Sequence, residues 1–569
     1  MSSERVSSVL IVGAGPVGLT LALDLARRGI EVAIIEQRRK GDAPDPKCNH
    51  VSSRSMEVFR RLGIAAKLRN AGLPADYPHA IAYRTAFTGR ECGRIHIPCR
   101  RDRFTDRTGA DSNWPTPELP HRVNQLMLEP ILFDYVAATP RVKIYNRVEL
   151  ESFSQDEDQV TAVGRDLDTG EFQTYSARYF IGCDGARSTV RRGLGIKLEG
   201  DGEFMRVQAT FIRAPQLIAQ QQHERAWMTY SLNPKLSGNV IAIDGRELWM
   251  IFNFLRPDQF DFDVVDRDGS IRAILGVGPD FTYEVISKQD WIGRRLIAER
   301  FRDRRIFLAG DAAHLWAPYA GYGMNAGIAD AMNLSWLLAA NLNGWAPAAI
   351  LDAYEAERWL ITEQVSRLAM SQAEEETRRR GSVPAHILDE GPEGEQARAE
   401  AGRVACETNT KQFAAAGLNF GYFYDSSPLI AYDGSAHPTY TLGSFTSSTV
   451  PGCRVPHLWF DDGRSLYDAL GPEYTLLRFD PSVDVGPLAA AAQKRGVPLA
   501  VLDVVSKEAS ALYSTKLVLA RPDQHIAWRG DELPSEPFRL IDRVRGALAA
   551  GQGRVNTSGE WFNCAADGC

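Results

Sequence analysis

A glycine-rich turn between two apolar stretches constrains this chain more than any other feature of its sequence. Residues 9–12 are apolar and predict a short β-strand, residues 16–28 have the spacing of a helix, and residues 31–35 predict a second strand. The glycines before the helix are spaced G-x-G-x-x-G, and an acidic residue follows the second strand. A β-turn-α-β unit with this spacing predicts a site that binds a dinucleotide.

Each residue of this turn has a physical role in such a site. Gly13 permits the tight turn, Gly15 lets a pyrophosphate approach the backbone, and Gly18 lets the helix pack close to the strand. The helix N-terminus offers free N–H groups and partial positive charge. Glu36 can accept hydrogen bonds from a ribose. The predicted cofactor contacts of this unit are Gly13, Gly15, Pro16, Gly18, Glu36 and Gln37.

The composition of the chain excludes several classes of protein. Its 569 residues suffice for two to four domains, and its net charge of −7 gives no basis for nucleic-acid binding. No apolar run reaches the ~18 residues of a membrane-spanning helix, and the first strand comes so early that we expect no signal peptide. None of the eight cysteines forms a C-x-x-C pair or a Cys/His metal pattern. We therefore expect a cytoplasmic protein with no metal, membrane or nucleic-acid partner.

A second turn that could face a nucleotide follows another predicted strand. Residues 179–191 predict a strand, a sharp turn at Asp184 and Gly185, and then a helix capped by Ser188. The turn ends its strand as the glycine-rich turn does, so we expect the two to face the same ligand.

A third turn lies in the second most informative stretch of the chain. Residues 306–309 predict a strand that ends at Gly310 and Asp311, and a glycine-bearing loop then leads into a long helix that starts near Met324. We expect Asp311 to accept a hydroxyl from a ribityl chain, and the amides at the helix N-terminus to stabilise negative charge on a reduced flavin ring. The predicted cofactor contacts of this stretch are Asp311, Pro318, Gly321, Gly323, Met324 and Asn325.

The rest of the chain divides by its periodicity. Residues 204–254 contain several aromatic, alternating runs, which predict an antiparallel sheet with one face over a pocket. Residues 76–121 predict loops and edge strands, and residues 350–415 predict charged helices interrupted by a surface connection at 391–402. Beyond about residue 435 the pattern predicts a small α/β unit.

On these motifs the chain resembles the FAD-dependent aromatic hydroxylases, which are single-component class A flavoprotein monooxygenases. The G-x-G-x-x-G at residues 13–18, the Asp-Gly motif at 183–188, the Gly-Asp motif at 310–314 and the flavin-proximal loop at 318–325 match the motifs of that family in the same order. The resemblance is to the phenol and hydroxyphenylpropionate hydroxylase branch, and it covers residues 5 to about 430. It implies that Arg54, Gln125 and Asp184 also contact FAD.

The resemblance implies an α/β fold with a Rossmann-like FAD-binding domain, an antiparallel-sheet substrate domain of the hydroxybenzoate hydroxylase type, a helical region and a thioredoxin-like C-terminal domain. The C-terminal unit lacks C-x-x-C, so we expect it to stabilise the fold or a homodimer rather than to perform redox chemistry. The implied divisions are residues 1–75, 110–200 and 290–345 for FAD, 76–109 and 201–289 for substrate, 346–434 for the helical region and 435–569 for the C-terminal domain.

The activity that the resemblance implies is hydroxylation of a phenolic substrate. NADPH or NADH reduces FAD, the reduced flavin and molecular oxygen form a 4a-hydroperoxide, and its distal oxygen attacks a ring carbon ortho or para to a hydroxyl. The protein must exclude water and favour the phenolate. The branch has an acidic residue near Asn49, and an amide cannot be a base, so either another group deprotonates the phenol or the substrate arrives ionised. The catalytic candidates are His50, Asn49, Tyr230 and His314.

Four alternatives remain on the residues alone. A hydroxylase or epoxidase that tailors a larger polyketide or other polycyclic product would use the same residues. A flavin-dependent halogenase would need a W-x-W-x-I-P stretch, which the sequence lacks. A plain NAD-dependent dehydrogenase would leave residues 310–325 without a role. A flavin-binding sensor without catalysis would show no substrate-dependent consumption of NAD(P)H and oxygen.

Overall fold

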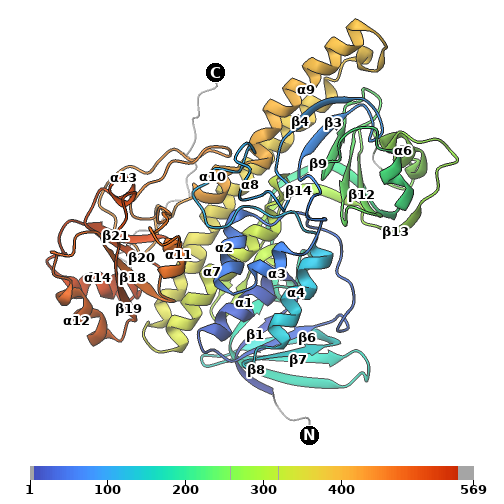
Figure 1. Ribbon diagram of the computed structural model, residues 1–569. Coiled ribbons are helices and arrows are strands. Elements are labelled where there is room, and N and C mark those ends of the chain that lie inside the picture. The colour runs from blue at the N-terminus through green and yellow to red at the C-terminus, as the bar shows by residue number, and fades with distance from the viewer. Residues whose placement is uncertain (1–4, 257, 260, 318, 549–569) are drawn as a thin grey trace.

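The computed structural model describes residues 5–256, 258–259, 261–317 and 319–548. Within that part of the chain, the strands form three sheets (Figure 1). In the view of Figure 1, the first sheet lies at the bottom, the second at the upper right and the third at the left, and long helices run between them. The fold therefore brings segments that are far apart in sequence to the junction of two sheets.

The first sheet is built around the strand that precedes the glycine-rich turn. In sheet order its strands are β15 (Arg302–Asp303), β16 (Ile306–Leu308), β8 (Phe172–Gly182), β1 (Arg5–Val12), β2 (Val32–Glu36) and β5 (Val142–Asn146), with β7 (Val160–Asp166) paired to β8 and β6 (Val148–Gln155) paired to β7. β1 runs parallel to both neighbours, so that Val9 lies opposite Val32 and Tyr179. Buried parallel strands are apolar on both faces, which explains the continuous apolar run at residues 9–12.

The helices that cover this sheet begin and end at residues suited to those positions. α1 (Pro16–Arg27), α4 (Gln125–Ala137) and α5 (Thr189–Gly193) contact its strands, whereas α2 (Ser53–Arg61) and α3 (Ala65–Arg69) pack on other helices. α1 has a proline in its first turn, and Gly29 takes the left-handed conformation just after it, with φ of 85°. Ser188 caps α5 by accepting from the Arg191 N–H, as the sequence predicts.

The second sheet is antiparallel except at one pair of strands. In sheet order its strands are β17 (His314–Leu315), β14 (Trp291–Ala298), β9 (Leu198–Arg213), β12 (Leu248–Phe254), β11 (Gly238–Ala242), β10 (Met228–Ser231), β3 (Ile81–Arg84) and β4 (Glu91–Ile95), with β13 (Glu284–Lys288) also on β9. Tyr230 lies opposite Tyr83 and opposite Asn239, which places the three side chains on one face. The helix α6 (Arg267–Leu275) covers the other face, where Ile274 packs against Gly238.

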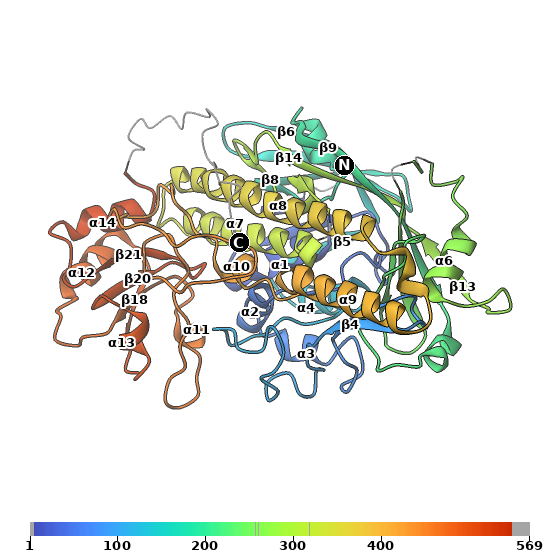
Figure 2. The same cartoon turned by 90° about the horizontal axis from the view of Figure 1, so that it is seen from above.

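The helical core between the sheets contains one correction to the sequence prediction. Its helices are α7 (Gly323–Leu342), α8 (Asp352–Gly381), α9 (Pro392–Phe413) and α10 (Ala416–Phe420), with short 3-10 turns η1 (Pro215–Gln220), η4 (Ala348–Leu351) and η5 (Ala385–Leu388) elsewhere. Figure 2 shows α7 and α8 running beside each other across the molecule. The surface connection predicted at 391–402 is wrong, because α9 spans these residues. Gly402 packs against β4, where a Cβ would lie 1.8 Å from the Cys92 carbonyl oxygen.

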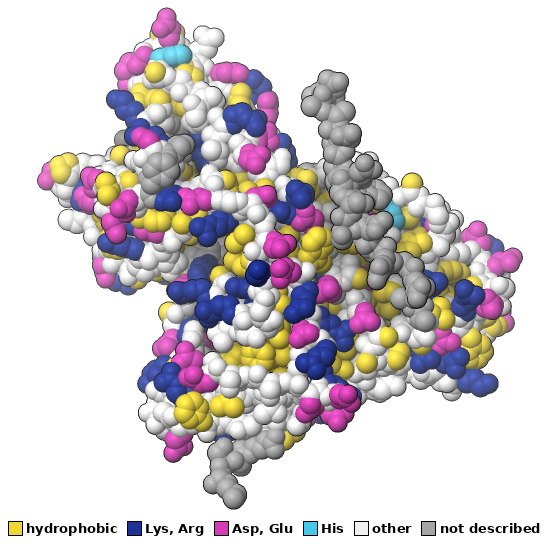
Figure 3. Space-filling model, turned by 180° about the vertical axis from the view of Figure 1, so that it is seen from behind, with side chains coloured by type: hydrophobic (Ala, Val, Ile, Leu, Met, Phe, Trp, Pro, Cys, Tyr) yellow, Lys and Arg dark blue, Asp and Glu magenta, His cyan; other side chains and the backbone are white. Residues whose placement is uncertain are grey.

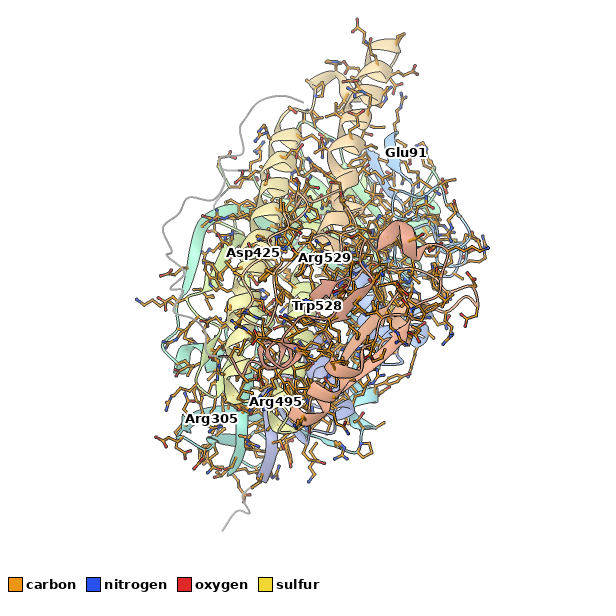
Figure 4. The ribbon with its side chains drawn as sticks, turned by 90° about the vertical axis from the view of Figure 1, so that its left-hand side faces the viewer. Glu91, Arg305, Asp425, Arg495, Trp528 and Arg529 are labelled. Carbon is orange, nitrogen blue, oxygen red and sulfur yellow. The ribbon has the colours of Figure 1, made fainter. Side chains whose placement is uncertain are left out.

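The C-terminal domain is a small mixed sheet with helices. Its strands in sheet order are β19 (Leu499–Asp503), β18 (Tyr474–Arg478), β20 (Leu517–Ala520) and β21 (Ile526–Gly530), and its helices are α11 (Leu466–Ala469), α12 (Gly486–Arg495), α13 (Ala509–Leu512) and α14 (Pro537–Val544). β18 is parallel to β19 and antiparallel to β20, and β20 is antiparallel to β21. This arrangement agrees with the thioredoxin-like unit expected from the sequence. Figure 4 faces the domain, with Trp528 and Arg529 of β21 near the centre.

The expected α/β class is confirmed, whereas the assignment of four domains with separate roles stays a prediction. In the described ranges, no helix combines the length and apolar character that crossing a bilayer requires. The same residues contain no group of three or more histidine, cysteine or acidic side chains arranged to hold a metal. On the face seen in Figure 3, basic and acidic side chains are interspersed rather than gathered by sign.

Candidate active site

Two of the three glycines in the glycine-rich turn lie in close contact with the chain, and the third faces open space. A Cβ at Gly13 would lie 2.5 Å from the carbonyl oxygen of Cys183, and one at Gly18 would lie 2.1 Å from the Gly13 oxygen. Gly13 also has a φ of 103°, a conformation that favours glycine. At Gly15 nothing lies within 4 Å of a Cβ. The turn is thus closed on the protein side and open at the N-terminus of α1, where Pro16 is the first helical residue.

Glu36 ends β2 in a chain of hydrogen bonds that the sequence did not reveal. Its carboxylate accepts from the Ala14 N–H at 2.7 Å and from the Arg38 N–H at 2.9 Å. Arg38 also bridges to Glu129 at 2.6 Å, and Gln125 at the start of α4 donates to Glu129 at 2.8 Å. The structure therefore brings Gln125 to the carboxyl end of β2, and its contact with FAD stays a prediction.

Two further predicted contacts have different surroundings. Gln37 is exposed directly after β2. Arg54 is turned toward the C-terminal domain, where it donates to Gln524 at 2.7 Å and to the Asp523 carbonyl at 3.3 Å, besides its pair with Glu57 at 3.1 Å. The guanidinium of Arg54 thus has three protein partners, and no hydrogen bond in the structure directs it to the glycine-rich turn.

Asp184 serves the start of α5. It accepts from the Ser188 hydroxyl at 2.6 Å and from the Thr189 and Val190 N–H groups at 2.7 and 3.1 Å. Burial raises the pKa of this carboxyl, although these hydrogen bonds oppose the shift. Burial also raises the pKa of the neighbouring Cys183 thiol, which makes it a poor nucleophile.

Asp311 lies in η2 (Gly310–Ala312), directly after β16. The residue is exposed, yet burial by the surrounding protein raises the pKa of its carboxyl. Among the residues that the structure describes, none donates a hydrogen bond to it. Asp311 is therefore open to hydroxyl groups from outside the chain.

His314 belongs to a buried cluster centred on Asp330 of α7. The Asp330 carboxylate accepts from the Gly310 N–H at 3.1 Å and from Arg358 at 2.8 Å, and it pairs with His314 Nε2 at 2.7 Å. The His314 ring stacks on Trp316 with centroids 4.8 Å apart. This arrangement fixes the turn after β16 against α7 and α8, so a positioning role fits His314 better than proton transfer.

Asn325 ties the loop before α7 to the segment that follows Asn49. Its amide donates to the Gly321 oxygen at 2.6 Å and to the His50 oxygen at 3.1 Å, and its own oxygen accepts from the Ser52 N–H at 2.9 Å. Gly321 has a φ of 62°, and a Cβ there would lie 3.0 Å from the His50 Cβ. The loop turn is η3 (Tyr319–Gly321); Gly323 starts α7, Met324 is half-buried, and Pro318 lies outside the described residues.

His50 contacts a residue that sequence reasoning missed, Arg122. The Arg122 guanidinium donates to His50 Nδ1 and lies 4.4 Å from the centroid of the Trp227 ring. A guanidinium only donates, so Nδ1 accepts and the proton of a neutral imidazole lies on Nε2. Burial and the Arg122 charge hold the pKa of His50 well below its usual range. Next to it, Asn49 accepts from Asn124 at 2.6 Å.

Aromatic side chains line the face of the second sheet near this contact. Tyr230 and Tyr83 stack with centroids 5.5 Å apart, and Phe413 of α9 packs edge-on against both Tyr230 and Trp227 at 6.3 Å. Burial raises the pKa of Tyr230, so its hydroxyl stays protonated. The alternating pattern of residues 204–254 predicts this face, whereas no local signal in the sequence identifies Arg122 as part of it.

Comparison with known proteins adds independent information. Residues 6–369 match the FAD binding domain family, and residues 448–552 match the family described as aromatic-ring hydroxylase, C-terminal. The chain is 31% identical to a tetracenomycin B2 monooxygenase-dioxygenase of Streptomyces olivaceus, over 95% of this chain and 98% of the relative. It is also 31% identical to a 4-methyl-5-nitrocatechol 5-monooxygenase of a Burkholderia species, over 95% and 97%. A solved structure of RebC with bound 7-carboxy-K252c superimposes with a TM-score of 0.87 at 34% identity, covering 96% of this chain and all of RebC.

Proposed function

The chain belongs to the FAD-dependent monooxygenases of the aromatic-ring hydroxylase family, and from that premise we propose that it uses NADPH or NADH and molecular oxygen to hydroxylate a phenolic ring. The family match over residues 6–369 includes the glycine-rich turn, the turn after β16 and the start of α7. When bound, FAD supplies the redox chemistry that activates oxygen.

The residues of the chain fit such a cofactor at three points. The open approach to Gly15 suits a pyrophosphate at the N-terminus of α1. Glu36 lies at the carboxyl end of β2, where a ribose is held in dinucleotide sites. Asp311 offers ribityl hydroxyls a carboxylate that accepts no hydrogen bond from the described residues, and the N-terminus of α7 offers amides to the ring. The predicted contacts that we retain for this proposal are Gly13, Gly15, Pro16, Gly18, Glu36, Gln37, Gln125, Asp184, Asp311, Pro318, Gly321, Gly323, Met324 and Asn325.

The single observation that carries the proposal is the triple hydrogen bond of Asn325. It fixes the loop before α7, which the family resemblance assigns to the flavin ring, against His50. His50 contacts Arg122, and Arg122 contacts Trp227 on the aromatic side of the second sheet. A ring bound between these elements would be shielded from water, as oxygen transfer requires.

His50 cannot act as a base through Nδ1 while it accepts from Arg122, and its low pKa keeps the ring neutral. Its Nε2–H is a donor and would stabilise an anionic oxygen. The tyrosine of β10, Tyr230, is a weak acid and equally unsuited to deprotonate a phenol. We therefore favour the alternative in which the substrate binds already ionised, with its proton released to solvent.

The test is a panel of phenols added to the FAD-loaded enzyme. We expect a subset to stimulate both NAD(P)H oxidation and oxygen uptake and to yield a product with one added oxygen atom. In Asp311→Ala the same phenols should give weaker FAD retention and more hydrogen peroxide per NAD(P)H oxidised. Phenol-independent oxidation with unmodified phenols would reject hydroxylation, and unchanged FAD affinity and coupling would remove Asp311 from the site.

A second candidate is the hydroxylation or epoxidation of a polycyclic natural product. It is favoured by the names of relatives, since one acts on tetracenomycin B2 and RebC is solved with 7-carboxy-K252c. The nitrocatechol relative, at the same identity as the tetracenomycin one, favours a small phenol. Comparing kcat/KM for single-ring and multi-ring phenols of equal acidity separates the two, and the higher value identifies the substrate class.

We further propose a cytoplasmic homodimer. The six described cysteines are free, as a reducing compartment maintains them, and the thioredoxin-like domain lacks the C-x-x-C that redox chemistry would need. A molar mass by light scattering twice that of one chain would support the dimer, and a single-chain mass would reject it.

A further inference from the structure

Arg122 is a buried cation that makes no ion pair of its own, because the buried carboxylate that acts on it, Asp111, is paired with Arg103. It is 3% exposed, and among the described residues its hydrogen-bond partners are His50 Nδ1 and the Phe413 carbonyl oxygen at 3.5 Å. The ring of Trp227 covers the guanidinium at 4.4 Å. No carboxylate in the described ranges lies within ion-pair distance of it. Burial lowers the pKa of Arg122 to about 10, which leaves it charged at neutral pH.

Two other buried arginines in this chain have an ion pair of their own. Arg103 donates to Asp111 at 2.5 Å, and Arg358 donates to Asp330 at 2.8 Å. An isolated buried charge is costly, and proteins pair such charges or use them to bind a ligand. Arg103 and Arg122 share the charge of Asp111, so one positive charge of this cluster is not balanced by it.

A second observation at the same place also indicates a missing polar partner. His79 is 1% exposed, and neither of its ring nitrogens has a hydrogen-bond partner in the described structure. Burial lowers the pKa of His79, and the charges of Arg122 and Arg103 lower it further, so the three groups are electrostatic neighbours. Buried polar atoms are nearly always satisfied, by water or ligand where protein does not satisfy them.

The position of this cluster links it to the loop before α7. His50 connects them, since its Nδ1 accepts from Arg122 while its Cβ and Cδ2 lie beside Gly321. The free donor of His50, Nε2–H, is on the same edge of the ring as Cδ2. The two ring nitrogens of an imidazole point away from each other, so an oxygen bound to Nε2–H does not also reach the guanidinium at Nδ1. An anion that binds the remaining N–H groups of Arg122 would lie beside Trp227, while His50 holds the guanidinium near the loop.

We propose that Arg122 forms an anion subsite that binds one ionised oxygen group of the aromatic substrate, either a phenolate or a ring carboxylate, and that His50 positions its guanidinium. This proposal rests on the proposed function, because it assigns the substrate of the same site. The anion balances the Arg122 charge, and the hydrogen bond to His50 Nδ1 orients the guanidinium. Neutral analogues leave the guanidinium unpaired, so the subsite selects acidic ring compounds.

The experiment measures binding of matched probes to the full-length FAD-loaded enzyme through changes in flavin absorbance. The carboxylate probe is 1-naphthoate, and its neutral control of the same shape is 1-naphthamide. The phenolate probe is 4-nitrophenol above its pKa, with nitrobenzene as the neutral control. We expect wild type to bind at least one anion roughly 10- to 100-fold more tightly than its control, as one charged hydrogen bond provides.

The variants assign that preference to Arg122. Arg122→Gln should abolish the preference by weakening the anion alone, and Arg122→Lys should keep part of it because the charge remains. His50→Gln, whose side-chain oxygen can still accept from Arg122, should weaken anion binding less than Arg122→Gln does. The matched control is Arg398→Gln, since Arg398 is equally buried but donates to the carbonyls of Ile387 and Asp389. It should leave both affinities unchanged.

Several outcomes overturn the subsite. Wild type that binds neither anion, or binds anion and control equally, rejects it, as does Arg122→Gln with equal losses for both probes. If Arg122→Gln loses FAD or fails to fold, the subsite is judged from the anion-to-control affinity ratios of wild type and of Arg122→Lys. The probe that responds identifies phenolate or carboxylate. Anion preference without phenol-stimulated oxygen uptake would reject the proposed function and keep the subsite. Hydroxylation without anion preference would reject the subsite and keep the proposed function.

Discussion

Two buried arginines, Arg521 and Arg122, differ in what surrounds their charge. Arg521 of the C-terminal domain donates to both oxygens of Glu357 on α8, at 2.6 and 2.7 Å, and to Asp523 at 2.8 Å. Arg122 donates to an imidazole nitrogen and, at 3.5 Å, to one carbonyl. Both side chains are almost fully inaccessible to solvent, so burial alone does not distinguish them.

The two arginines differ in whether the chain supplies a carboxylate that pairs with the buried charge. The pair of Arg521 with Glu357 joins the C-terminal domain to the helical core, and every atom of the contact is supplied by the chain. A pair of this kind adds little net stability, but loss of one partner leaves an unbalanced charge. Arg122 already has such an unbalanced charge, which an anionic ligand would relieve. The following predictions test this contrast.

The largest effect is expected where a compensated cluster loses one member. Glu357→Ala should lower the free energy of unfolding by about 3–5 kcal/mol, because the charge of Arg521 stays buried without its main partner. Urea unfolding measures the loss. The double variant Glu357→Leu with Arg521→Met should recover most of it. A double variant less stable than the single one would contradict the explanation.

The glycine-rich turn offers a similar comparison with smaller effects, between Gly13, which packing requires to be glycine, and Gly15, which faces open space. Gly13→Ala should cost about 3 kcal/mol, because its φ and the contact with the Cys183 oxygen both oppose a Cβ. Gly15→Ala should cost less than about 1 kcal/mol, because its φ of −77° is ordinary and a Cβ there meets open space.

Gly15→Asp should fold yet fail to retain FAD, as the flavin-to-protein ratio will show. Full flavin content in Gly15→Asp would contradict the site.

Acid should weaken the compensated cluster. Burial alone would raise the pKa of Asp523, but Arg521 and His525 hold that pKa well below its usual range. Since the folded pKa is lower than the unfolded one, the contribution is complete above the unfolded pKa and is lost as the pH falls toward the folded one. Unfolding free energies between about pH 5 and pH 2 should therefore fall by about 2 kcal/mol more in wild type than in Asp523→Asn. Equal slopes would remove Asp523 from the cluster.

The smallest effect is expected at Arg122. Arg122→Met should change the free energy of unfolding of the substrate-free enzyme by no more than about 1 kcal/mol, because the lost hydrogen bonds are offset by removal of an unbalanced charge. The same urea titration as for Glu357→Ala measures it. A loss as large as that of Glu357→Ala would show that the chain does compensate Arg122, which would remove the contrast.

Local spacing explains which features could be predicted. The glycine-rich turn, Glu36, the Asp-Gly turn and the loop before α7 each depend on a few consecutive residues, and the structure has the predicted elements at these points. Gly402 shows where local spacing fails to predict the structure. A glycine-rich and charged stretch is typical of a connection, but here Gly402 allows α9 to approach β4, and the partner is more than 300 residues away in sequence.

Charge partners were the least predictable part of the site. Arg54 was expected to contact FAD, yet its shortest hydrogen bond is to Gln524 in the C-terminal domain. Nothing in the residues around Arg122 signals that its charge is buried without a carboxylate of its own. Which residue balances a charge depends on tertiary packing, and a single sequence carries no periodic signal of it.

The three hydrogen bonds of Asn325 have a mechanical consequence. They join the backbone at Gly321, at His50 and at Ser52 into one rigid unit, so a displacement of the loop before α7 carries His50 with it. The separation between the backbone at Gly321 and the backbone at His50 is thereby conserved when the loop moves. Substitutions on the second sheet can then change its aromatic face without altering this spacing.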